Sequence, residues 1–552
     1  MDELWYKDAV FYEVYVRAFK DSNGDGQGDL RGLASKLDYL KELGVDCLWL
    51  LPICQSPLVD DGYDVSDYRR LLPEYGDIVD FQYLVQEAHA RGIRVITDLI
   101  MNHTSDQHPW FVESRSSRSS VKRDYYLWSA TDQRFHQARV IFVDTQKSNW
   151  QFDPATSEFY FHRFYPQQPD LNYDNPLIQQ GMIDIMRFWL DLGIDGFRCD
   201  AVPYLFKREG TNCENLPETH AYLKRVRAFV SDHYAGKILL GEANQWPREA
   251  REYFGNGDEF QMAFHFPLMP RIFMSLASED RTPILATLHQ APPIPETCQW
   301  CIFLRNHDEL TLEMVTEQER ERMWNVYAPE PRMRLNLGIR RRLAPLLDNN
   351  RRKIEMANSI LFTMPGSPII YYGDEIGMGD NIWLDDRDGV RTPMQWTNGE
   401  NAGFSDADAT LLYEPPIRDA VYGYTKVNVQ AEQADPSSLW NAIRHMIAVR
   451  KEHRAFGRGN LNFLLTENTA ILAYLREHQG EVVLVVNNLS SQRQEVVLAL
   501  PGFQGITPID LMTDTPQQTI TSDAYRLRLS PYEYLWLSLN VPKGQNGPGN
   551  SK

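Results

Sequence analysis

The sequence predicts an α/β fold. We expect a (β/α)8 TIM barrel, a small domain inserted after its third strand, and a C-terminal antiparallel β-sandwich domain. Short runs rich in β-branched and aromatic residues alternate with amphipathic helical segments, which is typical of parallel sheets. There are eight such runs, and eight is the strand number of this closed barrel. A doubly wound open sheet is the alternative, but no Gly-x-Gly-x-x-Gly motif follows the first strand.

The barrel elements are placed by their apolar patterns. The eight strand candidates begin at Val10, Cys47, Arg94, Gly196, Lys237, Gln261, Cys301 and Ser367. Helical segments between them begin at Leu33, Phe81 and Pro176. The first and third of these helices place Leu, Ile or Met at helical spacing and stop at Gly. We therefore assign residues 1–103 and 176–456 to the barrel.

Three regions depart from this alternation. About seventy residues rich in Trp, Tyr, His and Ser follow the third strand, which is too long for a simple loop, so residues 104–175 should form an inserted domain over the active face. A second excursion, at about 310–350, follows the seventh strand and is placed to act as a lid. Alternating strands without helices predict a C-terminal β-domain over 457–541. The polar tail 542–552 is expected to be disordered.

Composition excludes several classes of protein. A formal net charge of −19 argues against binding nucleic acid or an anionic membrane, because both favour basic patches. The basic run from Glu113 is short and Ser-rich and is interpreted as a solvated loop. We find no signal-peptide pattern and no apolar run of membrane-spanning length. The six cysteines, including the CxxC of Cys298 and Cys301, are interpreted as reduced packing residues of a cytoplasmic protein.

Four predicted strands end in ionisable residues, at the end where barrels place catalytic groups. The residues at these strand ends are Asp98, the amide Asn102 and His103; Arg198 and Asp200; Glu242; and His307 and Asp308. Arg198 and Asp200 point to the same face of their strand, since side chains alternate. A fixed guanidinium should keep a buried carboxylate ionised and lower its pKa. A structural ion pair is the alternative for this pair taken alone.

The motifs DLIMNH, GFRCD, GEAN and RNHDE occur in this order, and with them essentially the whole chain resembles the α-amylase superfamily of retaining enzymes, glycoside hydrolase family 13. The resemblance implies that Asp200 is the nucleophile, Glu242 the general acid/base and Asp308 the transition-state stabiliser. Retention needs one ionised and one protonated carboxyl group, about 5–5.5 Å apart. The resemblance further implies that Arg198 holds the nucleophile ionised and that His103 and His307 bind the sugar.

Two further segments narrow the sugar subsite. SPLVDDGYDVSDY resembles exo-acting members, which implies that Asp60 binds the non-reducing glucose and Tyr63 stacks on its face. GVRTPMQW resembles the α-glucosidase branch and implies that Arg391 contacts the sugar. A surface salt bridge is the alternative for Arg391.

A Gly- and Asp-rich loop follows the first strand. DSNGDGQGDL has oxygen ligands on alternate residues, like the start of an EF-hand loop. The resemblance implies a structural Ca²⁺ or Mg²⁺ there, and a metal-free turn is the alternative. The implied ligands are Asp21, Asn23, Asp25, the carbonyl of Gln27, and Asp29. A second family site would use Asn102, Asp170 and carbonyls near Tyr204 and Leu205. Lys207 stands where relatives often carry glutamate, which counts against the second site. No organic cofactor is expected.

Long segments from Ala201, Gly241 and Arg305 resemble the trehalose synthase branch of the superfamily. This implies an enzyme that isomerises maltose to trehalose reversibly and within one pocket, through a β-glucosyl-enzyme, with minor hydrolysis to glucose. A hydrolytic exo-acting α-glucosidase or oligo-1,6-glucosidase is the alternative. A non-catalytic sugar-binding or transporter-associated barrel is a remote one, because all three catalytic carboxylates are present. The expected partners are the sugars maltose, trehalose and glucose, and no binding to nucleic acid or membrane is expected. The sequence does not decide whether the chain forms a homo-oligomer.

Overall fold

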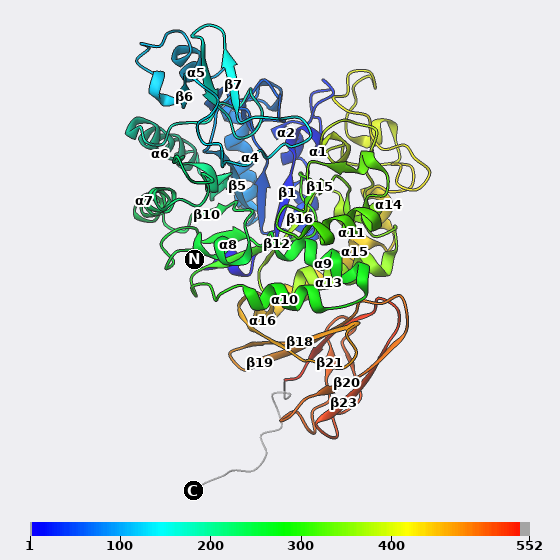
Figure 1. Ribbon diagram of the computed structural model, residues 1–552. Coiled ribbons are helices and arrows are strands. Elements are labelled where there is room, and N and C mark those ends of the chain that lie inside the picture. The colour runs from blue at the N-terminus through cyan, green and yellow to red at the C-terminus, as the bar shows by residue number, and fades with distance from the viewer. Residues whose placement is uncertain (1–2, 541–552) are drawn as a thin grey trace.

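The computed structural model describes residues 3–540, and its centre is a closed barrel of parallel strands in the order β1-β16-β12-β11-β10-β9-β5-β2 (Figure 1). The bounds are β1 (Phe11–Val14), β2 (Cys47–Leu50), β5 (Arg94–Ile100), β9 (Gly196–Asp200), β10 (Ile238–Gly241), β11 (Met262–Phe264), β12 (Gln299–Phe303) and β16 (Ser367–Tyr371). All eight strand candidates form the barrel, so the predicted fold class is confirmed, and the open-sheet alternative is wrong.

The strand register places the charged residues beside one another. Between β5 and β9, Asp98 pairs with Arg198 and Ile100 with Asp200. Between β9 and β10, Arg198 pairs with Leu240. Gly196 starts β9 with a φ of +150°, and an added Cβ there would lie 2.0 Å from the carbonyl oxygen of Ile238. Only glycine therefore lets β9 pack against β10 at this point.

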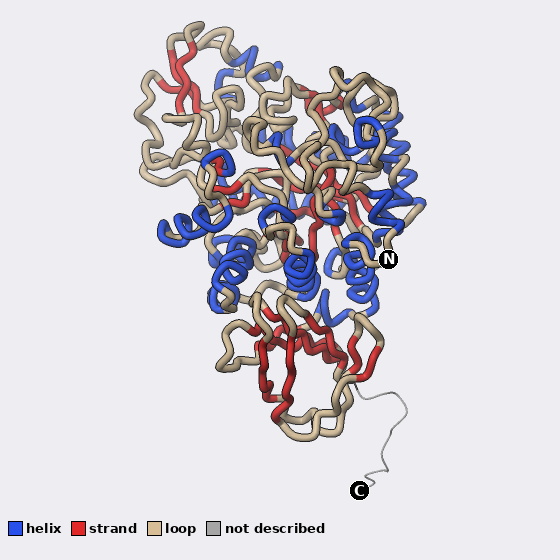
Figure 2. The backbone as a smooth tube through the Cα atoms, turned by 90° about the vertical axis from the view of Figure 1, so that its right-hand side faces the viewer, coloured by secondary structure: helices blue, strands red, loops and turns tan. Residues whose placement is uncertain are grey.

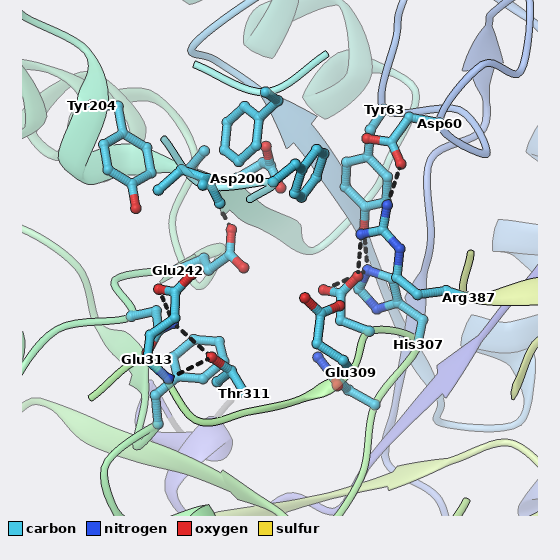
Figure 3. Close-up of a pocket in the computed structure, with 18 of the residues that line it drawn as sticks. Asp60, Tyr63, Asp200, Tyr204, Glu242, His307, Glu309, Thr311, Glu313 and Arg387 are labelled. Carbon is cyan, nitrogen blue, oxygen red and sulfur yellow. Dashed lines mark hydrogen bonds and ion pairs between the residues drawn. The ribbon is translucent and has the colours of Figure 1, made fainter. Parts of the chain in front are cut away.

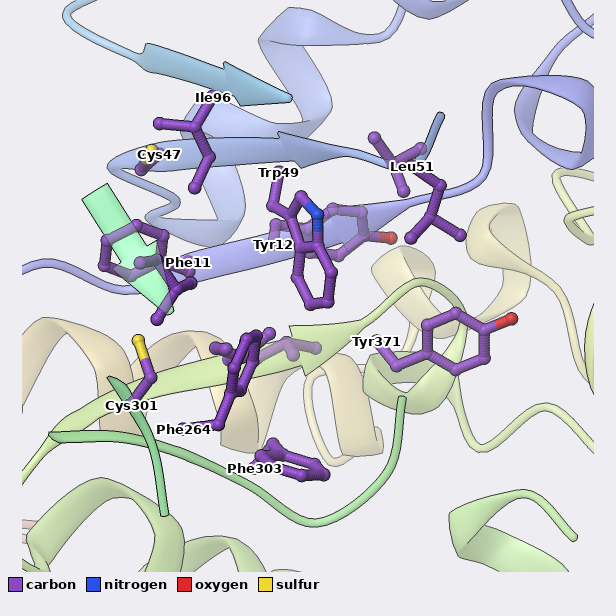
Figure 4. Packing of buried hydrophobic residues seen from close by; sticks show 14 of the residues in the cluster. Phe11, Tyr12, Cys47, Trp49, Leu51, Ile96, Phe264, Cys301, Phe303 and Tyr371 are labelled. Carbon is purple, nitrogen blue, oxygen red and sulfur yellow. The ribbon is translucent and has the colours of Figure 1, made fainter. Parts of the chain in front are cut away.

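The barrel interior is apolar and aromatic. Figure 4 shows Trp49, Phe264 and Phe303 packed between the strands. The ring centroids of Trp49 and Phe264 lie 5.4 Å apart. Above them, the Trp49 indole meets the imidazole of His307 edge-on at 5.7 Å. The core therefore extends to the floor of the region that carries the predicted catalytic groups.

Helices surround the barrel and fill the connections between strands. Their bounds are α1 (Val16–Phe19), α2 (Leu30–Ala34), α3 (Leu37–Leu43), α4 (Ile78–Ala90), α5 (Pro109–Ser114), α6 (Pro176–Asp191), α7 (Pro217–His233), α8 (Pro247–Glu252), α9 (Leu268–Ser278), α10 (Thr282–Gln290), α11 (Glu317–Tyr327), α12 (Leu343–Leu346), α13 (Arg351–Thr363), α14 (Val429–Ala434), α15 (Leu439–Glu452) and α16 (Arg454–Arg458).

The single helix predicted from Leu33 is wrong in detail, because α2 and α3 replace it. Asp29 caps α2 by accepting a hydrogen bond from the backbone N–H of Gly32, so the first helix begins three residues early. At Lys36 the backbone leaves the helical region, with φ −107° and ψ 4°. The apolar periodicity continues across this break, which is why the sequence pattern does not reveal it.

Two insertions lie beside the carboxyl ends of the barrel strands. Residues 104–175 contain α5 and the antiparallel sheet β6-β8-β7, with bounds Trp128–Ser129, Glu158–Phe161 and Trp150–Asp153. The segment after β12 contains α11, α12 and the sheet β13-β15-β14, with bounds Leu310–Thr311, Gly338–Ile339 and Arg334–Leu335. A short antiparallel pair, β3 (Cys54–Gln55) and β4 (Asp67–Leu71), follows β2. The domain boundaries themselves stay a prediction.

The C-terminal region is antiparallel, as predicted. A six-stranded sheet has the order β17-β18-β19-β24-β21-β22, and β20 pairs with β23. Their bounds are β17 (Asn460–Phe463), β18 (Ile471–His478), β19 (Glu481–Asn488), β20 (Gln494–Ala499), β21 (Ile509–Asp510), β22 (Thr515–Pro516), β23 (Ala524–Leu529) and β24 (Tyr534–Ser538). This domain lies at the opposite end of the molecule from β6 and β7 (Figures 1 and 2). The predicted disordered tail, 542–552, lies outside the described residues.

Two remaining predictions concern the chain as a whole. Within residues 3–540, no helix is both long enough and apolar enough to cross a membrane. All six cysteines are buried and unpaired, including Cys298 and Cys301. Burial raises the pKa of both of these thiols, which agrees with a role in packing.

Candidate active site

A pocket at the carboxyl end of the barrel gathers most of the predicted catalytic and sugar-binding residues (Figure 3). It is lined by seven of them: Asp60, Tyr63, His103, Asp200, Glu242, His307 and Asp308. The last five follow or end β5, β9, β10 and β12, so four strands that are distant in sequence contribute to one site. Arg198 and Arg391 do not line the pocket and lie buried behind it.

A single guanidinium contacts three carboxylates beneath the pocket. Arg198 Nη1 lies 2.6 Å from Asp98 Oδ1 and 2.5 Å from Asp200 Oδ1. Arg198 Nη2 lies 2.8 Å from Glu242 Oε1. The other oxygen of Glu242 accepts a hydrogen bond from the backbone N–H of Ala201 at 2.9 Å. The carboxylates of Asp200 and Glu242 are thus held by opposite nitrogens of one arginine.

The expected low pKa of Asp200 is wrong. Burial raises the pKa of Asp200 well above its usual value, and the charges of Glu242 and Asp98 add to the rise, although Arg198 opposes it. Burial likewise raises the pKa of Asp98 to about 6. A low pKa would hold for one carboxylate beside one guanidinium. In the structure three carboxylates share that one positive charge, so the cluster of Asp98, Asp200 and Glu242 favours holding one proton.

Asp308 has the opposite electrostatic environment. Its carboxylate contacts Arg387 Nη1 at 3.0 Å and Arg391 Nη2 at 3.3 Å. Burial alone would raise the pKa of Asp308, but the positive charges of these two guanidiniums lower it below its usual range. Asp308 is therefore ionised, which suits a group that stabilises developing positive charge.

His307 and Tyr63 form one rigid unit in the pocket wall. Their rings stack with an interplanar angle of 8°, and Tyr63 Oη lies 2.7 Å from His307 Nε2. The other imidazole nitrogen, Nδ1, lies 2.5 Å from Glu13 Oε1. Burial lowers the pKa of His307 well below its usual value, so the imidazole is neutral. Tyr63 is placed for stacking, and its hydroxyl is already engaged.

Asp60 and His103 meet through a glutamine that the sequence analysis missed. Gln168 Nε2 donates to Asp60 Oδ2 at 2.9 Å and lies 3.3 Å from His103 Nε2. Asp60 Oδ1 accepts from Arg387 Nη2 at 2.7 Å. Burial raises the pKa of Asp60 to about 6 and lowers that of His103 to about 4. At neutral pH the first is an anionic acceptor and the second a neutral imidazole.

Arg387 is the main missed residue, and Arg391 has a different place from the one expected. Arg387 lines the pocket and bridges Asp60 and Asp308 (Figure 3). Arg391 donates to the backbone carbonyl of His307 and pairs with Asp61. It is buried, so it is neither a surface salt bridge nor a wall of the pocket. The only sequence signal for Arg387 was its position four residues before Arg391.

The segment after Asp308 runs along the pocket, with Glu309 beside His307 and with Thr311 and Glu313 on the side of Glu242 (Figure 3). Glu309, Thr311 and Glu313 line it together with Asn244 from the β10 loop. Glu313 accepts from Arg139 Nη1 at 2.9 Å and from Asn244 Nδ2 at 3.0 Å. Arg139 belongs to the insertion after β5 and also pairs with Glu214 at 2.8 Å. These contacts join the predicted lid to the inserted domain across the pocket. The sequence signal was the charged run after Asp308.

The first predicted metal loop has a suitable donor set but is tied by its own hydrogen bonds. Asp21 accepts from the backbone N–H groups of Asn23, Gly24 and Gly26 at 2.7–2.9 Å. The side chains of Asn23 and Asp25 accept hydrogen bonds from the backbone N–H groups two residues later. Asp29 accepts from the backbone N–H of Ser22. The side-chain oxygen of Gln27 accepts from Arg17, and this bond does not involve the backbone carbonyl of Gln27 that was predicted as a ligand. In the described part of the chain, no three His, Cys, Asp or Glu side chains are grouped to hold a metal.

The fold and the pocket together define a class of protein. A parallel barrel with ionisable groups gathered where its strands end is the arrangement of barrel enzymes. Three of these groups are carboxylates, two of them held by Arg198 and the third by Arg387 and Arg391. This is a barrel enzyme whose chemistry depends on carboxyl groups.

The chain belongs to the α-amylase family: residues 13–459 match the model of the alpha amylase catalytic domain, and residues 461–536 match that of the maltogenic amylase C-terminal domain. It is 57% identical to the trehalose synthase/amylase of Mycolicibacterium smegmatis, over 99% of this chain and 94% of that protein. It is 30% identical to the oligo-1,6-glucosidase of Parageobacillus thermoglucosidasius, over 98% and 100%. The crystal structure of the trehalulose synthase from Pseudomonas mesoacidophila matches with a TM-score of 0.77 at 29% identity, covering 97% and 99%.

The environment of Asp60 predicts a pH-dependent affinity for glucose. Asp60 is predicted to accept a sugar hydroxyl, and below pH 6 its carboxylate takes up a proton, so that this hydrogen bond loses its charge, because the pKa of Asp60 is about 6. Calorimetric titration with glucose should show weaker binding as the pH falls through this value. Asp60→Asn should bind glucose roughly 10- to 150-fold more weakly at neutral pH, since a charged hydrogen bond contributes about 1.5–3 kcal/mol, and should lose this pH dependence. Asp386→Asn, which removes another partner of Arg387, should keep it. An unchanged acid limb in Asp60→Asn would contradict the assignment.

Proposed function

We propose that the protein interconverts maltose and trehalose by a retaining double displacement inside one closed pocket. The observation that carries the proposal is the contact of Glu313 with Arg139 and Asn244, which ties the segment after Asp308 to the inserted domain at the side of the pocket away from Asp60. An enclosed pocket favours transfer to a sugar already present over transfer to water. The similarity to a protein named trehalose synthase/amylase supports the same reading.

In the first half-reaction, Asp200 attacks the anomeric carbon of the non-reducing glucosyl unit of maltose, and Glu242 donates a proton to the departing glucose oxygen. The shared guanidinium supports these roles. Asp98, Asp200 and Glu242 together carry more negative charge than Arg198 can balance, so the cluster favours one shared proton. In the proposed reaction Glu242 carries that proton when the sugar is bound, and Asp200 is the ionised partner. Ionised Asp308 stabilises the positive charge that develops on the sugar ring. Asp60 and Tyr63 hold the hydroxyls and the face of that ring.

In the second half-reaction, the freed glucose turns within the pocket and attacks through its own anomeric hydroxyl. Glu242 removes the proton from that hydroxyl, and the ester bond to Asp200 breaks. Two inversions at the transferred carbon give the α,α-1,1 linkage of trehalose. Water that reaches the ester instead releases glucose, which is the minor hydrolytic reaction.

A hydrolytic α-glucosidase is the second candidate. The 30% identity to an oligo-1,6-glucosidase over nearly the whole chain supports it. Its pocket would share the Asp60, Tyr63 and Asp308 subsite and would differ in admitting water beside Glu242. The products formed from maltose therefore separate the two functions.

A structural Ca²⁺ or Mg²⁺ in the loop 21–29 is part of the proposal, as is a cytoplasmic location. The all-oxygen donor set supports a hard cation, which would pin the loop that follows β1. The chemical steps use none of its residues. Removing the metal should therefore act on stability and not on chemistry.

Chelation tests this metal. EDTA should lower the melting temperature by a few degrees, about 1 °C for each kcal/mol of lost binding energy in a chain of this length, and change the initial rate at moderate temperature little. Asp25→Ala should remove the response, because Asp25 is one of the proposed ligands. Calorimetry with and without the chelator makes the measurement. A wild-type protein without bound metal, and with the same melting temperature in EDTA, would contradict the structural metal.

Isotope labelling tests the function. Unlabelled maltose incubated with excess ¹³C-glucose should give trehalose with almost no label early in the reaction, because the acceptor is the glucose that has just left. Asp200→Asn should form neither trehalose nor glucose. Glu313→Gln should raise the share of free glucose several-fold, whereas Glu317→Gln, an exposed change on α11, should not. Heavy early labelling would indicate an open transferase, and glucose as the sole product would indicate an α-glucosidase.

A further inference from the structure

A buried lysine occupies the place of the second predicted metal. Lys207 follows β9, and its side chain is 1% exposed. Its Nζ lies 2.7 Å from Asp170 Oδ2 and 3.0 Å from Asn102 Oδ1, and 3.5 Å from the carbonyl oxygen of Leu205. The ammonium thus contacts three of the four residues that the sequence analysis assigned as ligands of the second metal.

The residues of that site do not fit a metal ion while Lys207 is present. A Ca²⁺ would need oxygens at 2.3–2.6 Å, and the ammonium already stands among these oxygens. Two positive charges at the same carboxylate would also repel each other at close range. The ammonium of Lys207 and Asp170 Oδ2 form an ion pair whose angles fall outside the range of a hydrogen bond. The ammonium therefore acts on Asp170 mainly through its charge, as a metal ion would.

We propose that the Lys207 ammonium is a built-in cation that replaces the second structural metal and keeps this site metal-free. A metal ion brings charge to the oxygens but leaves when its concentration falls. A lysine supplies one positive charge that the chain itself carries. The stability of this site should therefore be independent of metal concentration.

The ammonium joins three segments that surround the pocket. Asn102 follows β5, Asp170 closes the insertion after that strand, and Leu205 lies in the loop after β9. Asn102 and Asp170 are completely buried, so their polar groups need a partner. Asp170 also accepts the backbone N–H of Arg163 at 2.8 Å and forms a β-bridge with His103. Lys207 is thus a positioning residue for the backbone that carries His103.

Replacing Lys207 by an acidic residue should restore a metal site. In Lys207→Glu the ammonium is gone and a carboxylate stands beside Asn102, Asp170 and Leu205. Dialysed against Ca²⁺ and washed, this variant should retain one more Ca²⁺ per chain than the wild type by elemental mass spectrometry. Its melting temperature should rise in excess Ca²⁺ by about 2 °C or more beyond any wild-type rise. Lys147→Glu makes the same charge change at an exposed position and should match the wild type.

Two results would overturn the proposal. One is a folded Lys207→Glu that retains the same amount of Ca²⁺ as the wild type. The other needs no change at Lys207. Asp25→Ala removes a ligand of the first loop, so this variant should retain no Ca²⁺. A Ca²⁺ held tightly by this variant would overturn the metal-free site at Lys207. This test holds even if Lys207→Glu does not fold. A wild-type protein without Ca²⁺ leaves the proposal standing and counts only against the metal of the first loop.

Discussion

The contacts of the Arg198 guanidinium with Asp98, Asp200 and Glu242 are the interaction on which the active site depends. The register of β5, β9 and β10 brings these groups together, and Gly196 allows the close strand approach that the register needs. Removing one partner of a buried ion pair typically costs about 3–5 kcal/mol, since it leaves an uncompensated charge. The same cluster therefore supports both the barrel and the placement of its two reacting carboxyl groups.

A second charge centre faces the first across the pocket. Arg387 bridges Asp60 and Asp308, and Arg391 supports Asp308 from behind. Here arginines keep a carboxylate ionised, whereas around Arg198 the carboxylates outnumber the positive charge. One side therefore offers anionic acceptors for sugar hydroxyls and the other favours a proton for the leaving oxygen. This difference between two sets of carboxylates is what a retaining displacement requires.

The fold and the central site could be predicted from local patterns in the sequence. The alternation of strand-like and helix-like segments and the charged residues at strand ends can both be recognised within short stretches of the chain. The eight strands and the gathering of Asp200, Glu242 and Asp308 were predictable for this reason. Arg387 and the Arg139–Glu313 contact were not, since the latter joins residues 174 positions apart. The raised pKa of Asp200 was missed because both its causes, burial and the carboxylates of Glu242 and Asp98 on other strands, depend on the folded structure. Lys207 was noticed as a departure from the family motif, but only the structure places its ammonium among the expected ligands.

Trapping the glycosyl-enzyme tests the central claim most directly. A fluorinated glucosyl fluoride that forms the ester quickly and loses it slowly should add one fluoroglucosyl group per chain, detected by the mass of the intact protein. After proteolysis the added mass should lie on the peptide containing Asp200. We predict labelling at Asp200 alone. Asp200 and Glu242 both line the pocket and contact different nitrogens of Arg198, and in the proposed reaction Asp200 is the nucleophile and Glu242 the acid. Label on Glu242, Asp98 or Asp308, or consumption of the reagent with no labelled protein, would contradict it.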